Sequence, residues 1–301
     1  MGRARSLVRF RGALLARMIA VGHDVTVFAA ELTPELATEL GTIGVRVETY
    51  PLARTGLGPL NDLKTYLSLV AGFRRVRPAV TLAYNIKPVI YAGLAARRVG
   101  GIQSWSLITG LGHLFTAPSF KTRLLRLLVT PLYRASLRAN VGQFFQNPDD
   151  LKELAEMRIC DPSKATLVAG SGVDMREFKV APMPEGRPTF LFVGRFLAQK
   201  GINELVSAME HVKQQYPDAR LQLIGSTDDN PSSLSAKEVA RLVESGTVEN
   251  LGWLDDVRPA IANASVMVLP SHREGTPRAV LEAMSMGRAI LTTDAPGCRE
   301  T

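Results

Sequence analysis

The sequence predicts an α/β fold made of two doubly wound domains that face each other across a cleft. Strand-like and helix-like segments alternate along nearly the whole chain, which is typical of parallel sheets covered by helices. The length of 301 residues suits two domains of ordinary size. A stretch rich in Pro and Gly, residues 182–188, separates two such alternating series.

The first domain is expected to span residues 1–180, with a linker at its end. Leu7, Phe10, Leu14 and Met18 recur at helical spacing, so the chain opens inside a helix. The next helix starts at Pro34, because proline suits the first helical position. The sequence predicts strands at 25–30, 45–50, 79–84, 104–109 and 141–146, and further helices at 59–76, 88–98, 119–138 and 149–157.

The second domain is expected to span residues 181–301, after a linker that lies within 147–188. Its alternating series predicts strands at 189–194, 220–225, 247–251, 265–269 and 289–293, and helices at 201–216, 234–245, 256–263 and 277–286. The first domain opens with a helix rather than a strand, and residues 294–301 read as a loop that enters a helix. Both domains are therefore expected to be incomplete.

The charge of the chain is divided unevenly. The net charge is +8, but residues 1–150 hold 19 Lys and Arg against 8 Asp and Glu, and residues 151–301 hold 17 against 20. A basic first half suits an anionic membrane surface, a phosphorylated acceptor or a nucleic acid. Nucleic acid is disfavoured, because aromatic residues are 6% of the chain and are not interleaved with basic ones.

Several classes of protein are excluded by simple features. No apolar run is long enough to span a membrane, and Arg9, Arg11 and Arg17 interrupt what would be a signal peptide. Two cysteines do not make a disulfide framework. No Gly-x-Gly pair extends to Gly-x-Gly-x-x-Gly, so a dehydrogenase is not expected. A cytoplasmic protein, peripheral on the inner face of the plasma membrane, fits these features and the charge.

The stretch Ser271–Gly287 carries the clearest functional signal. An apolar strand feeds it, Thr276 is expected as the N-cap of a helix with Pro277 at its first position, and Gly287 is placed to end that helix. Free backbone N–H groups at a helix N-terminus bind anions. Glu274 and Glu282 flank this site and suit a ligand with phosphate and hydroxyl groups, such as a nucleotide sugar. An ordinary strand–turn–helix unit with two solvated glutamates stays open on spacing alone.

A second group of residues follows the first strand of the second domain. Gly194 allows close approach of the backbone to a ligand, and Arg195 and Lys200 are both cations near the end of the strand. Arginine grips a phosphate with two hydrogen bonds, and lysine adds a point charge. Two cations on a surface loop are the alternative interpretation.

These motifs together resemble a known family. Gly-Arg-x4-Lys-Gly at 194–201, Glu-Gly-x-Pro at 274–277 and Glu-x7-Glu at 274–282 resemble the retaining family 4 glycosyltransferases of the GT-B fold class, which have two Rossmann-like domains. Residues 145–148, 170–174 and 293–300 fit the same family. In the first half, residues 10–12, 22–24, 84–88 and 109–112 resemble the bacterial subgroup that acts on polyprenyl-diphosphate-linked saccharides for capsule, O-antigen or N-glycan assembly.

The resemblance implies a role for each residue of the second domain. Arg195 and Lys200 match the pair that holds the donor's diphosphate, with Gly194 beside them. Gly275 and Thr276 would offer backbone N–H groups to it. Glu282 matches the carboxylate on the nucleotide ribose, and Glu274 matches the one beside the transferred sugar. The implied reaction moves an N-acetylhexosamine or hexose from a UDP-sugar to a lipid-linked saccharide with retention of configuration, without a metal or a cofactor.

Two residues of the first domain are also candidates. His113 follows Gly110-Leu-Gly112 after a strand and could orient the sugar or bind the acceptor hydroxyl, but a loop histidine without a chemical role is the alternative. Lys87 is a candidate for the acceptor's diphosphate, or else simply a lysine at the start of a helix. The basic and apolar helix at 121–138 could lie on an anionic membrane, although an ordinary covering helix has the same pattern.

Two other functions stay open beside the transferase. One is a non-catalytic product, either a truncated fragment or a membrane-surface binding protein. The other is a sugar-nucleotide epimerase on the same fold, which would need no acceptor.

Overall fold

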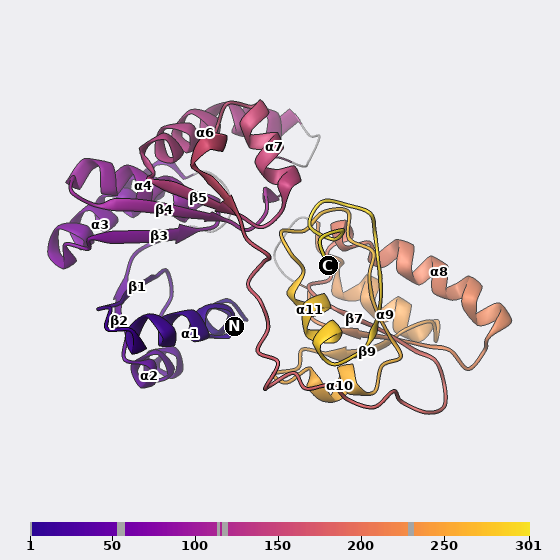
Figure 1. Cartoon of the computed structure of the whole chain (residues 1–301). Coiled ribbons are helices and arrows are strands. Elements are labelled where there is room, and N and C mark those ends of the chain that lie inside the picture. The colour runs from indigo at the N-terminus through magenta and orange to yellow at the C-terminus, as the bar shows by residue number, and fades with distance from the viewer. Residues whose placement is uncertain (1, 53–57, 113–114, 116–119, 228–231) are drawn as a thin grey trace. The chain divides into compact units, whose positions relative to one another are not determined.

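The computed structural model describes residues 2–52, 58–112, 115, 120–227 and 232–301 (Figure 1). The chain divides into two compact units. The first unit comprises Met1–Phe145 and Asp150–Ser171, and the second comprises Gln146–Asp149 and Gly172–Thr301. Both units contain parallel strands that alternate with helices, so the predicted α/β class is confirmed.

The second unit is built on one parallel sheet with the strand order β11–β10–β7–β8–β9. The order reverses between β7 and β10, which makes this the topological switch point of a doubly wound sheet. The strands are β7 (Thr189–Val193), β8 (Arg220–Ile224), β9 (Glu249–Gly252), β10 (Val266–Leu269) and β11 (Ala289–Thr292). The helices are α8 (Ile202–Gln215), α9 (Ala236–Glu244), α10 (Arg258–Ala262) and α11 (Arg278–Ser285), with a short 3-10 turn, η2 (Ala198–Lys200).

This sheet has a separate hydrophobic core on each face, and successive side chains of β7 pack alternately into the two cores. Phe192 packs in the cluster that contains Ile202 of α8 and Val239 of α9. Its neighbour Leu191 packs in the cluster that contains Ile261 of α10 and residues of α11. Successive strand residues point to opposite faces, so the apolar run 190–193 packs on both sides of the sheet, which is typical of a parallel sheet covered by helices.

The described residues of the first unit form two parallel sheets rather than the single expected one. One sheet pairs β1 (Thr26–Ala29) with β2 (Arg46–Thr49). The other holds β3 (Val80–Tyr84), β4 (Gln103–Ile108), β5 (Gly142–Phe145) and β6 (Ala165–Leu167) in chain order. The helices are α1 (Gly2–Ala20), α2 (Pro34–Ile43), α3 (Pro59–Val76), α4 (Ile86–Val99), α6 (Phe120–Ala139) and α7 (Pro148–Glu156), with a 3-10 turn, η1 (Pro162–Lys164).

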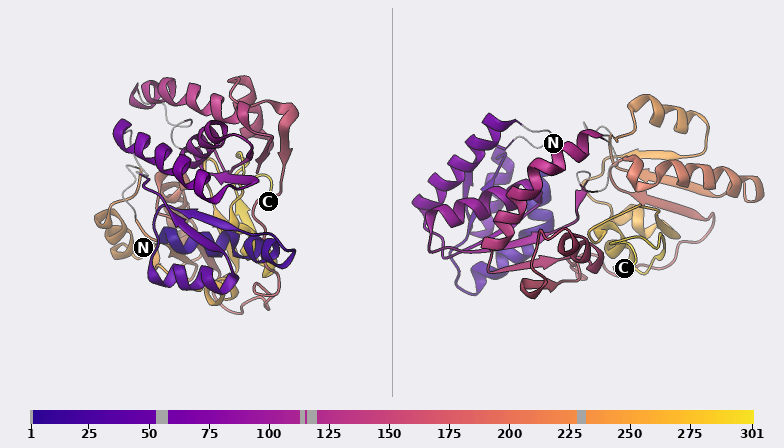
Figure 2. Two further views of the ribbon diagram at one scale, coloured as in Figure 1. Left: turned by 90° about the vertical axis from the view of Figure 1, so that its left-hand side faces the viewer. Right: turned by 90° about the horizontal axis from the view of Figure 1, so that it is seen from above.

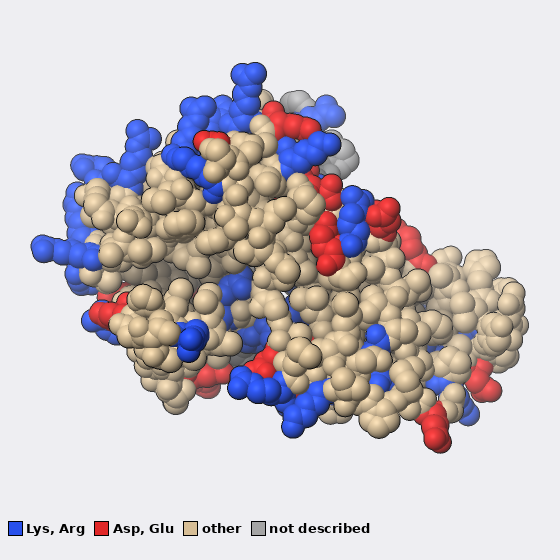
Figure 3. Space-filling view, in the orientation of Figure 1, with Lys and Arg blue, Asp and Glu red and all other residues tan. Residues whose placement is uncertain are grey.

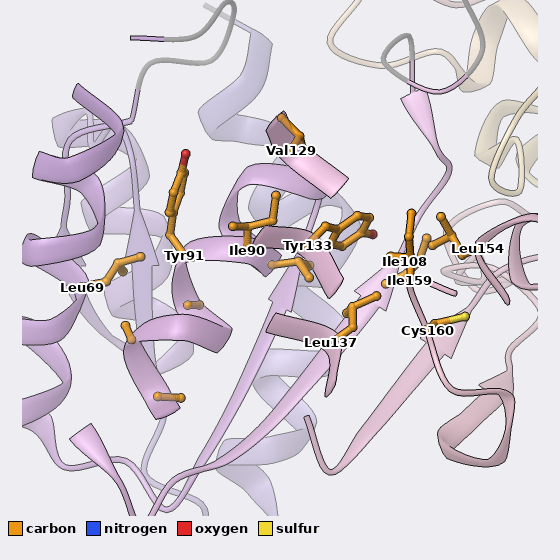
Figure 4. Packing of buried hydrophobic residues seen from close by; sticks show 14 of the residues in the cluster. Leu69, Ile90, Tyr91, Ile108, Val129, Tyr133, Leu137, Leu154, Ile159 and Cys160 are labelled. Carbon is orange, nitrogen blue, oxygen red and sulfur yellow. The ribbon is translucent and has the colours of Figure 1, made fainter. Parts of the chain in front are cut away.

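The helices of the first unit form two packed groups. Leu15 of α1 and Leu36 and Leu40 of α2 pack on Val27 of β1. The helices α3, α4 and α6 form a layer over the larger sheet, with α4 packed against both of its neighbours (Figures 1 and 2). Figure 4 shows a continuous band of buried side chains that runs from α3 through α4 to α6 and on to the segment beyond β5.

The segment between the two units explains where the division falls. Phe178 is buried in the second unit's core, and Ser285 Oγ donates a hydrogen bond of 2.6 Å to its carbonyl. The buried Arg288 guanidinium donates to the carbonyls of Ala181 and Pro182, and also to those of Ala262, Ala264 and Met286. The expected boundary at 180/181 therefore lies inside a segment that packs on the second unit, and the structure divides the chain at 171/172.

Candidate functional site

The candidate site lies at the carboxyl edge of the second unit's sheet, at its switch point. The loop after β7 carries Gly194, Arg195 and Lys200, and the loop after β10 carries Glu274. Because β7 and β10 are paired neighbours, both loops leave the sheet side by side. Ligands of doubly wound sheets bind in this position. The two groups of residues that the sequence singled out are thus brought together.

The loops after β7 and β10 are fastened to each other through Gly201. This residue has φ +71, and a Cβ there would lie 2.1 Å from the carbonyl oxygen of Pro270. Only glycine tolerates both the left-handed backbone and this approach. Two residues earlier in the same turn, the Gln199 carbonyl accepts a 3.0 Å hydrogen bond from the backbone N–H of His272. The position of Lys200 is therefore fixed by the β10 loop.

Lys200 and Glu274 form an ion pair at the centre of the site. Lys200 Nζ contacts Glu274 Oε1, and the two side chains are only 17% and 13% exposed. Ser271 Oγ donates a hydrogen bond of 2.6 Å to the same carboxylate oxygen. The pair spans 74 positions of sequence and joins the ends of two different strands. Charge-assisted bonds of this kind fix geometry strongly, because both partners are partly shielded from water.

The backbone of the turn that carries Glu274 is stabilised by contacts with residues to which the sequence analysis assigned no individual role. Asn147 Nδ2 donates to the carbonyls of Glu274 and Gly275, the second at 3.0 Å. The backbone N–H of Glu274 donates to the Pro296 carbonyl at 2.9 Å. A Cβ at Gly297 would lie 2.2 Å from the Glu274 carbonyl oxygen, so this close approach requires glycine. The only sequence signal was that 145–148 and 293–300 fitted the family motifs.

The helix after this turn starts later than the sequence predicts. α11 begins at Arg278, with Pro277 in the N-cap position, so the prediction that Thr276 caps the helix is wrong. Thr276 Oγ1 instead donates a 3.1 Å hydrogen bond to the carbonyl of Gln146. The predicted end is confirmed, because Gly287 has φ +75 just after the last turn.

Glu282 is buried inside α11. Its side chain is 3% exposed, and Oε1 accepts a 3.0 Å hydrogen bond from Arg278 Nε one helical turn earlier. A buried carboxylate must be paired, and Arg278 provides that pairing. Arg195, by contrast, is exposed to solvent. The two carboxylates of the site thus differ in surroundings: Glu274 pairs with a lysine of another loop, and Glu282 with an arginine of its own helix.

Cys298 packs behind the ion pair. It is buried, and its Sγ lies 3.8 Å from the Ser271 carbonyl oxygen. Burial raises the pKa of the Cys298 thiol, while hydrogen bonds from Thr293 and Thr292 oppose part of that rise. The thiol therefore stays protonated at neutral pH, which does not suit a nucleophile.

Of the first-unit candidates, Lys87 follows the carboxyl end of β3 in the larger sheet. Lys87, in the first turn of α4, forms a largely buried ion pair with Asp62 of α3 at 3.0 Å. Burial raises the pKa of Tyr91 to about 12, and the charge of Asp62 and a hydrogen bond to it add to the rise. Asn85, just after β3, has φ +68, a conformation that is uncommon for residues other than glycine. His113 lies outside the described residues.

Comparisons with known proteins identify the family. Residues 187–301 match the family model of group 1 glycosyl transferases. The N,N'-diacetylbacillosaminyl-diphospho-undecaprenol alpha-1,3-N-acetylgalactosaminyltransferase of Campylobacter jejuni is 26% identical over 287 residues, which cover 91% of this chain and 74% of that enzyme. Residues 187–301 therefore belong to the group 1 glycosyltransferases, and the chain as a whole is similar to enzymes of that class. The resemblance seen in the sequence motifs is thereby confirmed.

A second relative matches this glycosyltransferase along most of its length. The UDP-Gal:alpha-D-GlcNAc-diphosphoundecaprenol alpha-1,3-galactosyltransferase of Escherichia coli is 22% identical over 294 residues, which cover 91% of this chain and 72% of that enzyme. The family model matches only the part of the chain that carries the candidate site. These matches assign the chain to the glycosyltransferase class of enzymes.

Solved structures show the same fold. HepE from Anabaena, in complex with UDP and glucose, superposes with a TM-score of 0.71 at 16% identity and covers 97% of this chain and 78% of its own. Sucrose-phosphate synthase from Thermosynechococcus elongatus gives a TM-score of 0.73 at 20% identity, with 99% and 77% covered. These likenesses show the fold alone, which is the predicted GT-B class.

Within the described ranges, no group of three or more His, Cys, Asp or Glu residues is placed to hold a metal ion. Likewise, none of the helices described for the glycosyltransferase is long and apolar enough to cross a membrane.

Proposed function

We propose that this glycosyltransferase moves a hexose or N-acetylhexosamine from a UDP-sugar to a saccharide carried on a polyprenyl diphosphate, with retention of configuration. The observation that carries the proposal is the convergence of Lys200 and Glu274 at the switch point of the second unit. The two relatives support the acceptor class, because both are named for transfer to diphospho-undecaprenol-linked sugars. The UDP in one structural neighbour supports the donor class.

The residues of the second unit would bind the donor as follows. Lys200 and the exposed Arg195 hold the diphosphate, and the N–H groups of Gly275 and Thr276 add hydrogen bonds beside Gly194. Glu274 lies next to the sugar, where Asn147 fixes its backbone. Glu282 accepts a hydrogen bond from the ribose hydroxyl. It gives up part of its contact with Arg278 to do so.

The reaction breaks the bond between the sugar's anomeric carbon and the diphosphate, and forms a bond from that carbon to the acceptor oxygen on the same face. The proton of the acceptor hydroxyl passes to the leaving diphosphate, so UDP is released and no enzyme nucleophile is consumed. Negative charge grows on the diphosphate in the transition state. Lys200 and Arg195 stabilise that charge. Electrostatic stabilisation of this kind is usually the largest single contribution to an enzyme's rate enhancement.

The first unit would bind the acceptor. Lys87 would contact its diphosphate by sharing its ammonium group with Asp62, and His113 would bind the hydroxyl that attacks. The basic charge of residues 1–150 would hold this unit at the anionic membrane surface where a lipid-linked acceptor resides.

A donor screen with matched lysine variants tests the proposal. UDP release is measured for each UDP-sugar with and without a short-chain polyprenyl-diphosphate saccharide. Lys200→Ala should lower kcat/KM at least a hundredfold, about 3 kcal/mol of transition-state stabilisation. The exposed Lys237→Ala serves as control and should be unchanged. Acceptor-independent release would favour the epimerase, and full activity of Lys200→Ala would refute the site.

A further inference from the structure

Two helices of the first unit carry leucines on their solvent side as well as in the core. Leu60, Leu63 and Leu67 of α3 are between 52% and 77% exposed. Four leucines of α6, at positions 124, 127, 128 and 132, are between 44% and 72% exposed. Single exposed leucines are ordinary, but runs of them on one element mark an interaction surface.

The spacing places the exposed leucines of each helix on one stripe. On α3 they recur at i, i+3 and i+7, and on α6 at i, i+3, i+4 and i+8, which is one face of a helix in both cases. The opposite face of each helix is occupied by core residues, such as Phe73 of α3 and Tyr133 of α6. The stripes therefore do not belong to the core of the unit. We call them the α3 stripe (60, 63, 67) and the α6 stripe (124, 127, 128, 132).

Both stripes lie on the outer side of the same helical layer. The helix α4 packs against α3 on one side and against α6 on the other, and most of its own residues from Val89 to Ala96 are buried (Figure 1). The layer thus presents leucines at two places, separated by a helix that contributes chiefly to the core.

The same three helices are strongly basic. The sequences of α3, α4 and α6 contain 11 Lys or Arg and a single acid, Asp62, which is buried and paired with Lys87. Figure 3 shows Lys and Arg gathered over the part of the first unit where these helices lie. Lys64 and Arg74 of α3 and Arg123 and Arg138 of α6 are exposed on the same helices as the leucine stripes.

We propose that the outer face of α3 and α6 docks on an anionic lipid bilayer, with both leucine stripes entering the boundary between headgroups and acyl chains. Exposed apolar side chains on helices that also carry exposed cations are what an anionic lipid surface binds, since buried apolar area and electrostatic attraction act together. This inference deepens the proposed function, because it names the surface that would bring the enzyme to a lipid-linked acceptor.

The basic charge and the leucines of this face argue against two other binding partners, a second copy of the chain and a nucleic acid. In a symmetric dimer, a second copy would place the same basic helices against each other, and like charges repel. A nucleic acid would match the charge but would leave the leucines unused, because bases stack on aromatic side chains.

Vesicle flotation tests the surface directly. Wild-type protein should bind phosphatidylcholine vesicles that contain phosphatidylglycerol and bind pure phosphatidylcholine vesicles far more weakly. The triple variants Leu60→Ser/Leu63→Ser/Leu67→Ser and Leu124→Ser/Leu127→Ser/Leu128→Ser should each lower the partition coefficient at least tenfold. Arg123→Gln should lower it about fivefold, and more salt should weaken wild-type binding. Unchanged binding by both triple variants would overturn the proposal.

A matched control comes from three apolar residues that are equally exposed but lie off these helices. Met175, Val180 and Met183 are 55% to 77% exposed in the segment before β7. Their triple replacement by Ser should leave vesicle binding unchanged, and an equal loss would show that exposed apolar area in general is responsible. Circular dichroism and the thermal midpoint show whether each variant is folded.

A second readout keeps the proposal testable if the serine variants do not fold. Leu127→Cys and Met183→Cys are labelled with a polarity-sensitive dye, since the native cysteines, Cys160 and Cys298, are buried. The dye at 127 should shift to the blue on anionic vesicles, while the dye at 183 should not. A blue shift at both positions or at neither would contradict the proposal.

Two further measurements separate this surface from its alternatives. Sedimentation equilibrium without lipid should show a monomer, and a dimer that the leucine replacements dissociate would assign the face to a second copy. Transfer to a water-soluble short-chain acceptor should be the same in wild type and leucine variants. If no acceptor is used at all, the proposed function fails, whereas the vesicle result still decides the docking surface.

Discussion

At the scale of single residues, the site depends on a chain of polar contacts that runs from Asn147 through the Glu274 turn to Lys200. Asn147 is the residue farthest from the rest in sequence, and it donates to two backbone carbonyls of that turn. Without this amide, both carbonyls lose their donor in a place that is largely shielded from water. The exact direction of the Glu274 side chain is therefore set partly by a residue that touches no substrate.

Asn147→Ala should loosen the turn without removing a charge. We expect a loss of about 1–3 kcal/mol in the free energy of unfolding, because a buried hydrogen-bonding partner is removed. We also expect a higher KM for the donor, since Glu274 and Gly275 move relative to Lys200. Urea unfolding and steady-state kinetics measure the two effects. Asn203→Ala, on the exposed side of α8, is the control and should change neither quantity.

The two cysteines lead to a prediction about reactivity. Burial raises the pKa of Cys160 to about 11, and it also raises the pKa of Cys298. Because the thiolate is the reactive form, neither thiol of the folded protein should react with iodoacetamide at pH 8, whereas both should react in urea. The unfolded chain releases these protons first as pH rises, so stability should fall from about pH 8.5 upward. Rapid labelling of the native protein at pH 8 would contradict this account.

At the scale of elements, the sequence predicted most helices and strands to within a few residues. The helix 59–76 matches α3, because Pro59 starts it and an apolar stripe runs its full length. The strand β6 was missed, since it is only three residues long and two of those are exposed. Short exposed strands have no periodic pattern from which they could be recognised.

The start of α11 shows what sequence patterns cannot supply. Thr276 is of a residue type that often caps helices, but its hydroxyl donates a hydrogen bond to the Gln146 carbonyl, 130 positions earlier. The same applies to Asn147 and Gly297, whose roles exist only because distant segments meet at the Glu274 turn. Lys200 and Glu274 were predictable, because each follows an apolar strand at a sheet edge where ligands bind.

Gly201 links two elements and offers a matched test of that link. Gly201 and Gly246 both have φ +71, but only Gly201 has a neighbour within reach of an added Cβ, the Pro270 carbonyl. Gly246→Ala should cost roughly 1–2 kcal/mol from backbone strain alone. Gly201→Ala should cost about 1–3 kcal/mol more, because the carbonyl must be displaced. It should also weaken UDP binding, measured by calorimetry, and equal effects of the two changes would contradict the contact.

At the scale of the whole molecule, each of the two units contains one tryptophan, so the unfolding of each unit can be monitored by its own fluorescence. The chain has two tryptophans, Trp105 in β4 of the first unit and Trp253 just after β9 of the second. Trp253→Phe leaves a fluorophore that reports on the first unit, and Trp105→Phe leaves one that reports on the second. Unfolding of each unit can therefore be followed separately in otherwise full-length protein.

UDP should stabilise the second unit selectively, because every donor-binding residue proposed belongs to it. At a UDP concentration of about 100 times Kd, linkage predicts a gain of about 2.7 kcal/mol in the free energy of unfolding. The urea midpoint reported by Trp253 should rise accordingly, and Lys200→Ala should abolish the rise. A UDP-dependent shift seen from Trp105 but not from Trp253 would place the nucleotide in the first unit and contradict the assignment of the donor site. The short hydrogen-bonded network around Glu274 would then need a structural explanation instead of a catalytic one.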